Sequence, residues 1–138
     1  MKKLKYFIPS ILLMMIIFSF SNQTGSESSG LSSQIVAWFQ SNLNISIPEI
    51  VIRKGAHMSE YALLTLTFIY AFYKNKFPIY KFYTYSLIAC FAYACSDELH
   101  QLFIGGRAGQ FTDVLIDTTG GIIIVFIIYL ISKRKKSL

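Results

Sequence analysis

Polar side chains that could bind a ligand or transfer a proton recur at helical spacing in the middle of the chain. Arg53, His57 and Glu60 occupy positions i, i+4 and i+7, so a helix would place all three on one face. A guanidinium group binds phosphate or carboxylate through paired hydrogen bonds, and an imidazole beside a carboxylate can act as an acid or a base. This spacing therefore indicates an anion-binding or acid-base face.

A second polar face follows further along the chain, and a Gly-rich loop comes after it. Asp97, His100 and Gln101 obey the i, i+3, i+4 rule, and Glu98 lies one position around the same helix. Arg107 lies in the loop shortly before an acidic residue, so it is predicted either to pair with that acid or to wait for an anionic ligand. The candidate ligand-binding residues are Arg53, His57, Glu60, Asp97, Glu98, His100, Gln101, Arg107, Asp113 and Asp117.

The sequence gives less support to metal binding or nucleophilic catalysis by these residues. The chain has histidines and carboxylates that can ligate zinc, but it contains no HExxH or CxxC spacing, so we predict neither a metal nor a cofactor. No GxSxG motif is present and neither cysteine lies near the polar residues, so no catalytic residue is assigned. Two alternatives stay open. The first is an ion-paired lock between helices, which would make the protein a purely structural membrane scaffold. The second is acid-base catalysis by a histidine with a neighbouring carboxylate, which would make it a small membrane enzyme acting on a lipid-linked envelope substrate.

The elements that must position these residues are hydrophobic helices. Of the 138 residues, 54% are hydrophobic and 16% aromatic, more apolar surface than one soluble core of this length requires. The net charge of +6 comes from basic residues at the ends of apolar runs, which is typical of membrane flanks and not of a nucleic-acid-binding face. Cys90 and Cys95, five residues apart in one run, are predicted to be core residues without a disulfide.

The apolar runs predict four transmembrane helices in one domain that spans residues 1–138. Each run is close to the roughly 20 residues that a bilayer requires. The first is predicted to remain as a span, with signal-peptide cleavage after Ser21 as the alternative. In the fourth, Gly121 follows Asp117 by one turn, where a glycine lets a neighbouring helix approach closely. The predicted spans are residues 6–21, 56–73, 82–102 and 114–132.

The basic residues also predict an orientation. Ten of the thirteen Lys and Arg residues fall at the termini or in the 74–81 loop, which the positive-inside rule places in the cytoplasm. The other three, Arg53, Lys54 and Arg107, fall on the outer side together with all seven acidic residues. Because a charged side chain facing lipid costs about 2.5 to 3.5 kcal/mol, the charged groups are expected to face one another inside the bundle. The sequence therefore predicts a polar pocket that opens outward.

The segment between the first two spans has its own pattern. Leu31, Ile35, Trp38 and Leu43 recur at helical spacing, with serines and glutamines between them. This pattern favours a short helix at the membrane interface, where tryptophan is enriched. A plain solvated loop is the alternative.

Several short motifs have a common order around the four apolar runs. They are Ser19-Phe-Ser-Asn-Gln, Arg53-Lys-Gly-Ala-His with Glu60-Tyr, Asp97-Glu-Leu-His-Gln, Gly106-Arg, and Asp113-Val-Leu-Ile-Asp with Gly120. In this combination the chain resembles the VanZ-like family of membrane proteins, and the resemblance covers about residues 19–121.

The resemblance implies a multi-pass protein of the bacterial cell membrane. The family's founding member, from Gram-positive bacteria, is associated with low-level teicoplanin resistance, and no catalytic activity carries over from it. The expected partners are membrane lipids and, at the pocket, an anionic lipid-linked wall precursor or the glycopeptide, with no nucleic acid. The positions that the family motifs imply are Arg53, His57, Glu60, Asp97, Glu98, Gln101, Arg107 and Asp113.

Overall fold

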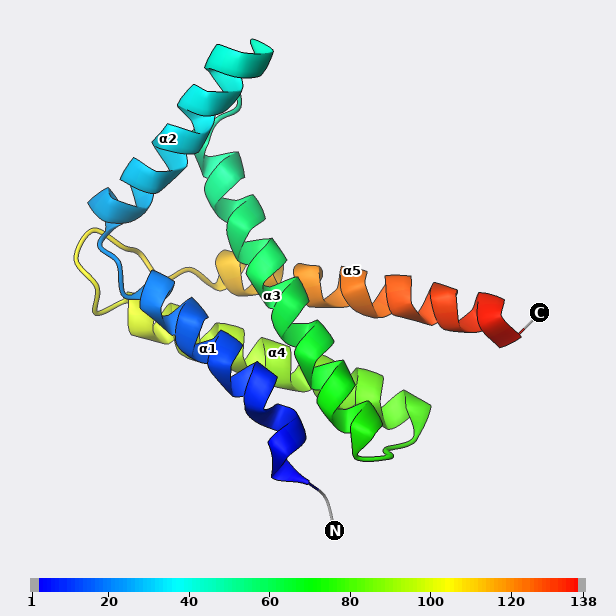
Figure 1. Cartoon of the computed structure of the whole chain (residues 1–138). Helices are drawn as coiled ribbons and strands as arrows, with labels where there is room; N and C mark the ends of the chain where they lie inside the picture. The colour runs from blue at the N-terminus through cyan, green and yellow to red at the C-terminus, as the bar shows by residue number, and fades with distance from the viewer. Residues whose placement is uncertain (1–2, 137–138) are drawn as a thin grey trace.

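The computed structural model describes residues 3–136, and every regular element in that range is a helix (Figure 1). The all-α prediction is confirmed. Two stretches, Leu4–Ser21 and Phe111–Arg134, are long and apolar enough to cross a membrane. The elements are η1 (Leu4–Phe7), α1 (Ile8–Ser21), α2 (Gly25–Leu43), α3 (Glu49–Lys74), α4 (Ile79–Gln101) and α5 (Phe111–Lys136).

Each predicted apolar run is helical over nearly its whole length, with the first shared between η1 and α1 and the third helical as far as Gln101. α3, α4 and α5 all begin earlier than the apolar pattern indicates. α3 begins directly after Pro48 and α4 directly after Pro78. Proline disfavours helical backbone in the residue before it and lacks the N–H that a helix interior needs, so it is well suited to the start of a helix. The first turns of α3 and α4, each with one charged residue among apolar ones, are therefore helical although the predicted spans began after them.

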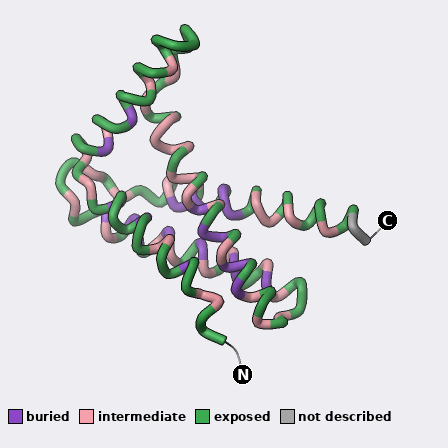
Figure 2. Tube along the Cα trace, viewed as in Figure 1, coloured by how far each residue is buried: buried purple, intermediate pink, exposed green. Residues whose placement is uncertain are grey.

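The core lies where α1, α3 and α4 meet the beginning of α5, as the buried positions in Figure 2 show. Ile17 of α1, Tyr61 and Leu64 of α3 and Cys90 and Ala94 of α4 are all buried. Both cysteines are free, as predicted. The C-terminal half of α5 extends away from the other helices (Figure 1), and its large apolar side chains are mostly exposed.

α5 crosses α3 at a contact between a glycine and a backbone carbonyl. A Cβ atom added to Gly120 would overlap the Met58 carbonyl oxygen, and one added to Gly121 would press on Thr65 and Cys90. The expectation that glycine permits close approach here is confirmed, and the closest backbone contact lies at Gly120, next to the position singled out in the sequence. The missing side chains let the two backbones touch.

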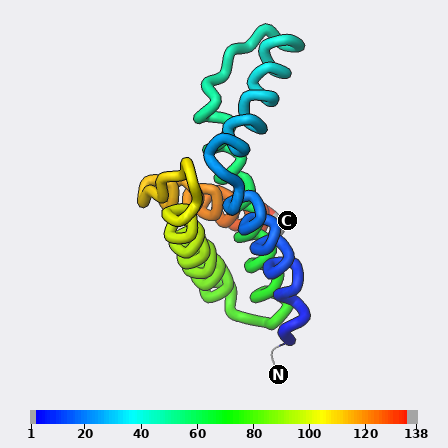
Figure 3. The backbone as a smooth tube through the Cα atoms, turned by 90° about the vertical axis from the view of Figure 1, so that its left-hand side faces the viewer, coloured from blue at the N-terminus to red at the C-terminus, as the bar shows by residue number. Residues whose placement is uncertain are grey.

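α2 confirms a helix in the segment between the first two spans, and Figure 3 shows it projecting from the other helices. Its first turn carries a capping box: the Glu27 N–H donates to Thr24 Oγ1 at 3.3 Å, and the Thr24 N–H donates to Glu27 Oε2 at 2.8 Å. The Thr24 N–H, together with the Thr24 hydroxyl that donates to the same oxygen at 2.8 Å, lowers the pKa of Glu27 because both stabilise the charged carboxylate. The helix ends at Asn44, whose φ of 53° is left-handed.

Hydrogen bonds join distant chain segments at the two opposite ends of the helix assembly. At the first, which we call the turn end, the Lys3 N–H donates to Asn75 Oδ1 at 2.6 Å, so the N-terminal segment contacts the α3–α4 turn. At the second, the loop end, the Gly25 N–H donates to the Gly105 carbonyl at 3.1 Å. The start of α2 therefore contacts the loop between α4 and α5. The candidate site lies at the loop end.

Candidate ligand-binding site

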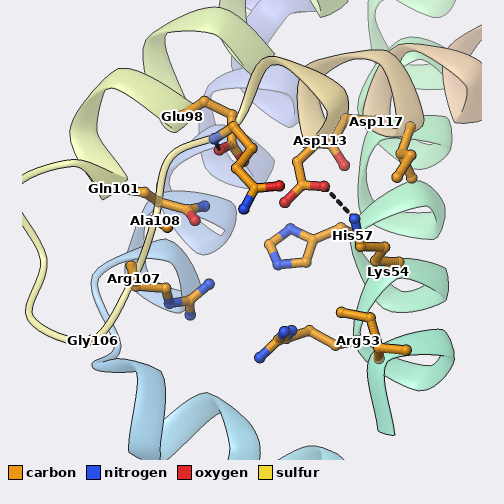
Figure 4. Close-up of a pocket in the computed structure, with 13 residues that line it drawn as sticks. Arg53, Lys54, His57, Glu98, Gln101, Gly106, Arg107, Ala108, Asp113 and Asp117 are labelled. Carbon is orange, nitrogen blue, oxygen red and sulfur yellow. Dashed lines mark hydrogen bonds and ion pairs between the residues drawn. The ribbon is translucent and has the colours of Figure 1, made fainter. Parts of the chain in front are cut away.

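A polar cavity of about 230 Å³ lies at the loop end, between α3, α4, the α4–α5 loop and the beginning of α5 (Figure 4). Its wall includes seven of the ten residues predicted from the sequence: Arg53, His57, Glu98, Gln101, Arg107, Asp113 and Asp117. Helical spacing places His57 one turn after Arg53 on α3, and Asp117 one turn after Asp113 on α5. The side chains therefore converge from three helices and one loop.

Arg107 is held by backbone carbonyls at the end of α1. Its Nε donates to the Gln23 carbonyl at 3.0 Å and its Nη2 donates to the Phe20 carbonyl at 3.2 Å. Carbonyls in the last turn of a helix have no partner within the helix and carry the negative end of its dipole, so a cation suits them. The predicted pairing of Arg107 with Asp113 is not found; Asp113 pairs with Lys54 instead, at 2.5 Å.

Arg53 faces Arg107 without an acid between them. Figure 4 shows both guanidinium groups and the His57 ring directed toward a common space. Burial lowers the pKa of Arg107, and the neighbouring positive charge of Arg53 lowers it further. Among residues 3–136, no hydrogen bond or ion pair reaches the Arg53 guanidinium. An anion in the space between Arg53 and Arg107 could accept hydrogen bonds from both guanidinium groups.

The opposite wall of the cavity is acidic, and most of its acids have partners. Asp113 pairs with Lys54, and Glu98 Oε2 accepts the Gln110 N–H at 2.8 Å. Asp117 is 1% exposed, and its Oδ2 has no hydrogen-bond partner among the described residues. The cavity thus has two zones, with arginines on one side and acceptor oxygens on the other, and His57 lies between them in Figure 4.

A second hollow, a groove of about 520 Å³, lies next to the cavity, between α2 and α3. Its wall is mainly apolar and includes Leu31, Ile35 and Trp38 from one face of α2. Three residues line both hollows: Arg53, His57 and Arg107. The groove and the cavity therefore meet at the two arginines.

Comparison with known proteins gives a family for this arrangement. The sequence model of VanZ/LLP1 matches residues 6–132. The chain belongs to the VanZ/LLP1 family. No curated protein and no solved structure matches it. The VanZ/LLP1 match includes every residue of the cavity and the groove, and it confirms the resemblance drawn from the motifs.

Three predicted residues of the VanZ/LLP1 region lie outside the cavity wall. Glu60 lines the groove, with its Oε2 3.9 Å from His57 Nδ1. Asp97 is buried behind the wall and accepts a hydrogen bond from Gln101 Nε2 at 3.3 Å, so it orients a cavity residue. His100 packs its ring against Phe18, with ring centroids 4.6 Å apart. The structure therefore gives His100 a packing contact and no contact with the cavity.

Lys54 is one of the three outer-side cations that the sequence expected to meet the acids, and it lines the cavity and neutralises Asp113. The groove, in contrast, was not predicted. The apolar stripe of α2 was its only signal, and the sequence alone assigned that stripe to the membrane surface.

Proposed function

We propose that this protein is a four-span integral membrane protein of the bacterial cell envelope that binds an anionic ligand in the polar cavity. The ligand is an envelope lipid, a lipid-linked wall precursor or the glycopeptide, and binding contributes to low-level teicoplanin resistance. The observation that carries the proposal is Arg53, a half-buried cation directed at Arg107 with no acid bound to either guanidinium group.

The chemistry of the arginines supports this proposal over a structural lock. In an ion-paired lock each cation would be neutralised by an acid on a neighbouring helix, and of the three loop-end cations Arg53, Lys54 and Arg107, Lys54 alone meets that description, through Asp113. Arg107 donates to neutral carbonyls, and Arg53 has no acceptor among residues 3–136. A bound phosphate or carboxylate would supply the acceptors that Arg53 lacks.

The distribution of charge and contacts supports the orientation of the four proposed spans α1, α3, α4 and α5. The N-terminal segment lies against the α3–α4 turn, so two Lys-bearing segments share the turn end. The opposite loop end holds Arg53, Lys54, Arg107 and the acids of the cavity. By the positive-inside rule the turn end is cytoplasmic and the cavity opens outward.

Single cysteines test this topology. On a Cys90→Ser, Cys95→Ser background, Ser33→Cys and Gly105→Cys are expected to react with a membrane-impermeant maleimide in intact cells, and Lys74→Cys only after permeabilisation. All three positions are exposed, and Gly105 has open space around it, so access and not burial decides the labelling. Labelling of position 74 in intact cells would reject the proposed orientation.

Native mass spectrometry of the purified protein tests the ligand. Wild type is expected to retain an anionic envelope component, and Arg53→Ala to lose it. The control is Lys81→Ala, which removes one positive charge at the first turn of α4, far along that helix from the cavity. Equal retention by wild type and Arg53→Ala would reject the anion site.

A small membrane enzyme acting on the same ligand is the second candidate, because one contact favours it. His57 borders both hollows, its Nδ1 has no hydrogen-bond partner among the described residues, and Glu60 Oε2 lies 3.9 Å away. A histidine so placed can transfer a proton. The same mass spectra separate the candidates: a binding protein returns the ligand with unchanged mass, whereas an enzyme converts it unless His57 is replaced by glutamine.

A further inference from the structure

The polar cavity and the apolar groove border each other, and the residues at this junction carry positive charge. Arg53, Arg107 and His57 are the residues that line both hollows. On the groove side of this junction the α2 wall presents Leu31, Ile35 and Trp38. A ligand that fills both hollows must therefore have a hydrocarbon part, an anionic group at its middle and a polar part beyond it.

On the cavity side of the junction, the wall residues determine which polar group the ligand can carry. Gln101 is 4% exposed and Asp117 is 1% exposed, and both contribute to the cavity wall. Asp117 Oδ2 is an acceptor without a donor among the described residues. Carboxylate and amide oxygens accept hydrogen bonds from hydroxyl groups and repel a second anion. The polar part of the ligand therefore carries hydrogen-bond donors, and hydroxyl groups are the uncharged donors that a lipid headgroup offers.

The volumes set the size of each part. Sites for drug-sized molecules measure about 300 to 1,000 Å³. The groove, at about 520 Å³, falls within that range, and the cavity, at about 230 Å³, lies below it. The cavity therefore suits a phosphate with a polyol of a few carbons and is too small for the disaccharide-peptide of a complete wall precursor.

We propose that the ligand is a glycerophospholipid with a small polyol headgroup. Its phosphodiester lies between Arg53 and Arg107, its headgroup hydroxyls face Asp117 and Gln101, and one acyl chain lies along the groove between α2 and α3. This inference rests on the proposed function and adds to it the class of the ligand and the place of its chain.

Trp38 provides the measurement, because it is the only tryptophan of the chain and lines the groove. Phosphatidylglycerol with brominated acyl chains, titrated into the protein in a non-brominated detergent, is expected to quench Trp38 saturably. Phosphatidylcholine with the same brominated chains reports background contact. Its half-saturating concentration is expected to be about tenfold higher, because choline has no hydroxyl group to donate to Asp117 and Gln101. Arg53→Ala is expected to weaken the binding of phosphatidylglycerol by about tenfold, as loss of one charge-assisted contact predicts.

Two variants fill the groove from opposite walls and leave the arginines in place. Ala56→Phe on α3 and Gln34→Phe on α2 both start from exposed side chains that line the groove, so both are expected to melt like wild type. Each is expected to abolish saturable quenching. Binding of glycerophosphoglycerol, the deacylated headgroup, is expected to persist in both and to be lost in Arg53→Ala, as measured by saturation-transfer NMR.

The outcomes distinguish the two levels of the proposal. In the first case, glycerophosphoglycerol binds in an Arg53-dependent manner, but phosphatidylglycerol quenches Trp38 no better than phosphatidylcholine does. This result would reject the placement of the acyl chain in the groove and would keep the anion site. Equal affinity for brominated phosphatidic acid, which lacks the second glycerol, would overturn the polyol part. If no anionic probe binds in an Arg53-dependent manner, the proposed function fails with the inference.

Discussion

Gly120→Ala is expected to destabilise the protein by about 3 kcal/mol, at the upper end of what overpacking usually costs. The added methyl group would overlap the Met58 carbonyl oxygen, which belongs to the backbone of α3 and cannot rotate away as a side chain would. α3 and α5 would have to separate, and the separation would disturb the cavity wall that they share. Thermal unfolding in detergent micelles measures the effect.

The matched control is the same substitution at Gly55, also inside a helix. A Cβ atom there meets nothing within 4 Å, so only the backbone effect of glycine remains. Alanine in a helix is more favourable than glycine by roughly 0.5 to 1 kcal/mol, so Gly55→Ala is expected to raise the melting temperature. A loss of stability in Gly120→Ala together with a gain in Gly55→Ala would show that α3 and α5 cross closely at Gly120. A stabilising Gly120→Ala would show that α3 and α5 do not touch there.

The second large effect is a difference in stability between the alanine variants of Arg107 and Arg53. Arg107→Ala is expected to lower stability by about 2 kcal/mol, because it removes two charge-assisted hydrogen bonds to the Phe20 and Gln23 carbonyls. Arg53→Ala is expected to leave stability unchanged or slightly raised, because Arg53 has no acceptor among residues 3–136 and repels Arg107. Thermal unfolding in detergent tests both.

Teicoplanin susceptibility of a host that expresses each variant gives the functional readout. Both alanine variants are expected to lose protection, but only Arg107→Ala is expected to lose stability with it. Arg107→Lys keeps the charge and loses the planar fork, so its stability is expected to lie between wild type and Arg107→Ala. If Arg53→Ala melts early, Arg53 has a structural role and the ligand site at the junction is rejected.

The sequence predicted the features that depend on one helix at a time. Apolar runs marked the helices, and the i, i+4 spacing of Arg53 with His57 and of Asp113 with Asp117 placed each pair on one face. The cost of exposing charge to lipid then predicted that such faces meet. The cavity wall follows that logic for seven of the ten predicted residues.

Contacts between elements were not predictable in the same way. Nothing in local spacing indicates that the loop carrying Arg107 folds over the end of α1, or that Lys54 and not Arg107 neutralises Asp113. Both depend on how a loop and two helices dock in three dimensions. The groove was missed for a related reason, because an apolar stripe on α2 looks the same whether it faces a membrane surface or another helix.

The contact between Arg107 and the end of α1 has a consequence for the order in which the chain assembles. The Phe20 and Gln23 carbonyls receive their donors from a residue more than eighty positions later, and the Gly25 N–H finds its acceptor at Gly105. During synthesis the end of α1 therefore lacks these contacts until α4 and the loop after it have been made. A nascent chain halted before residue 107 therefore lacks the cavity, because the loop and α5 supply part of its wall.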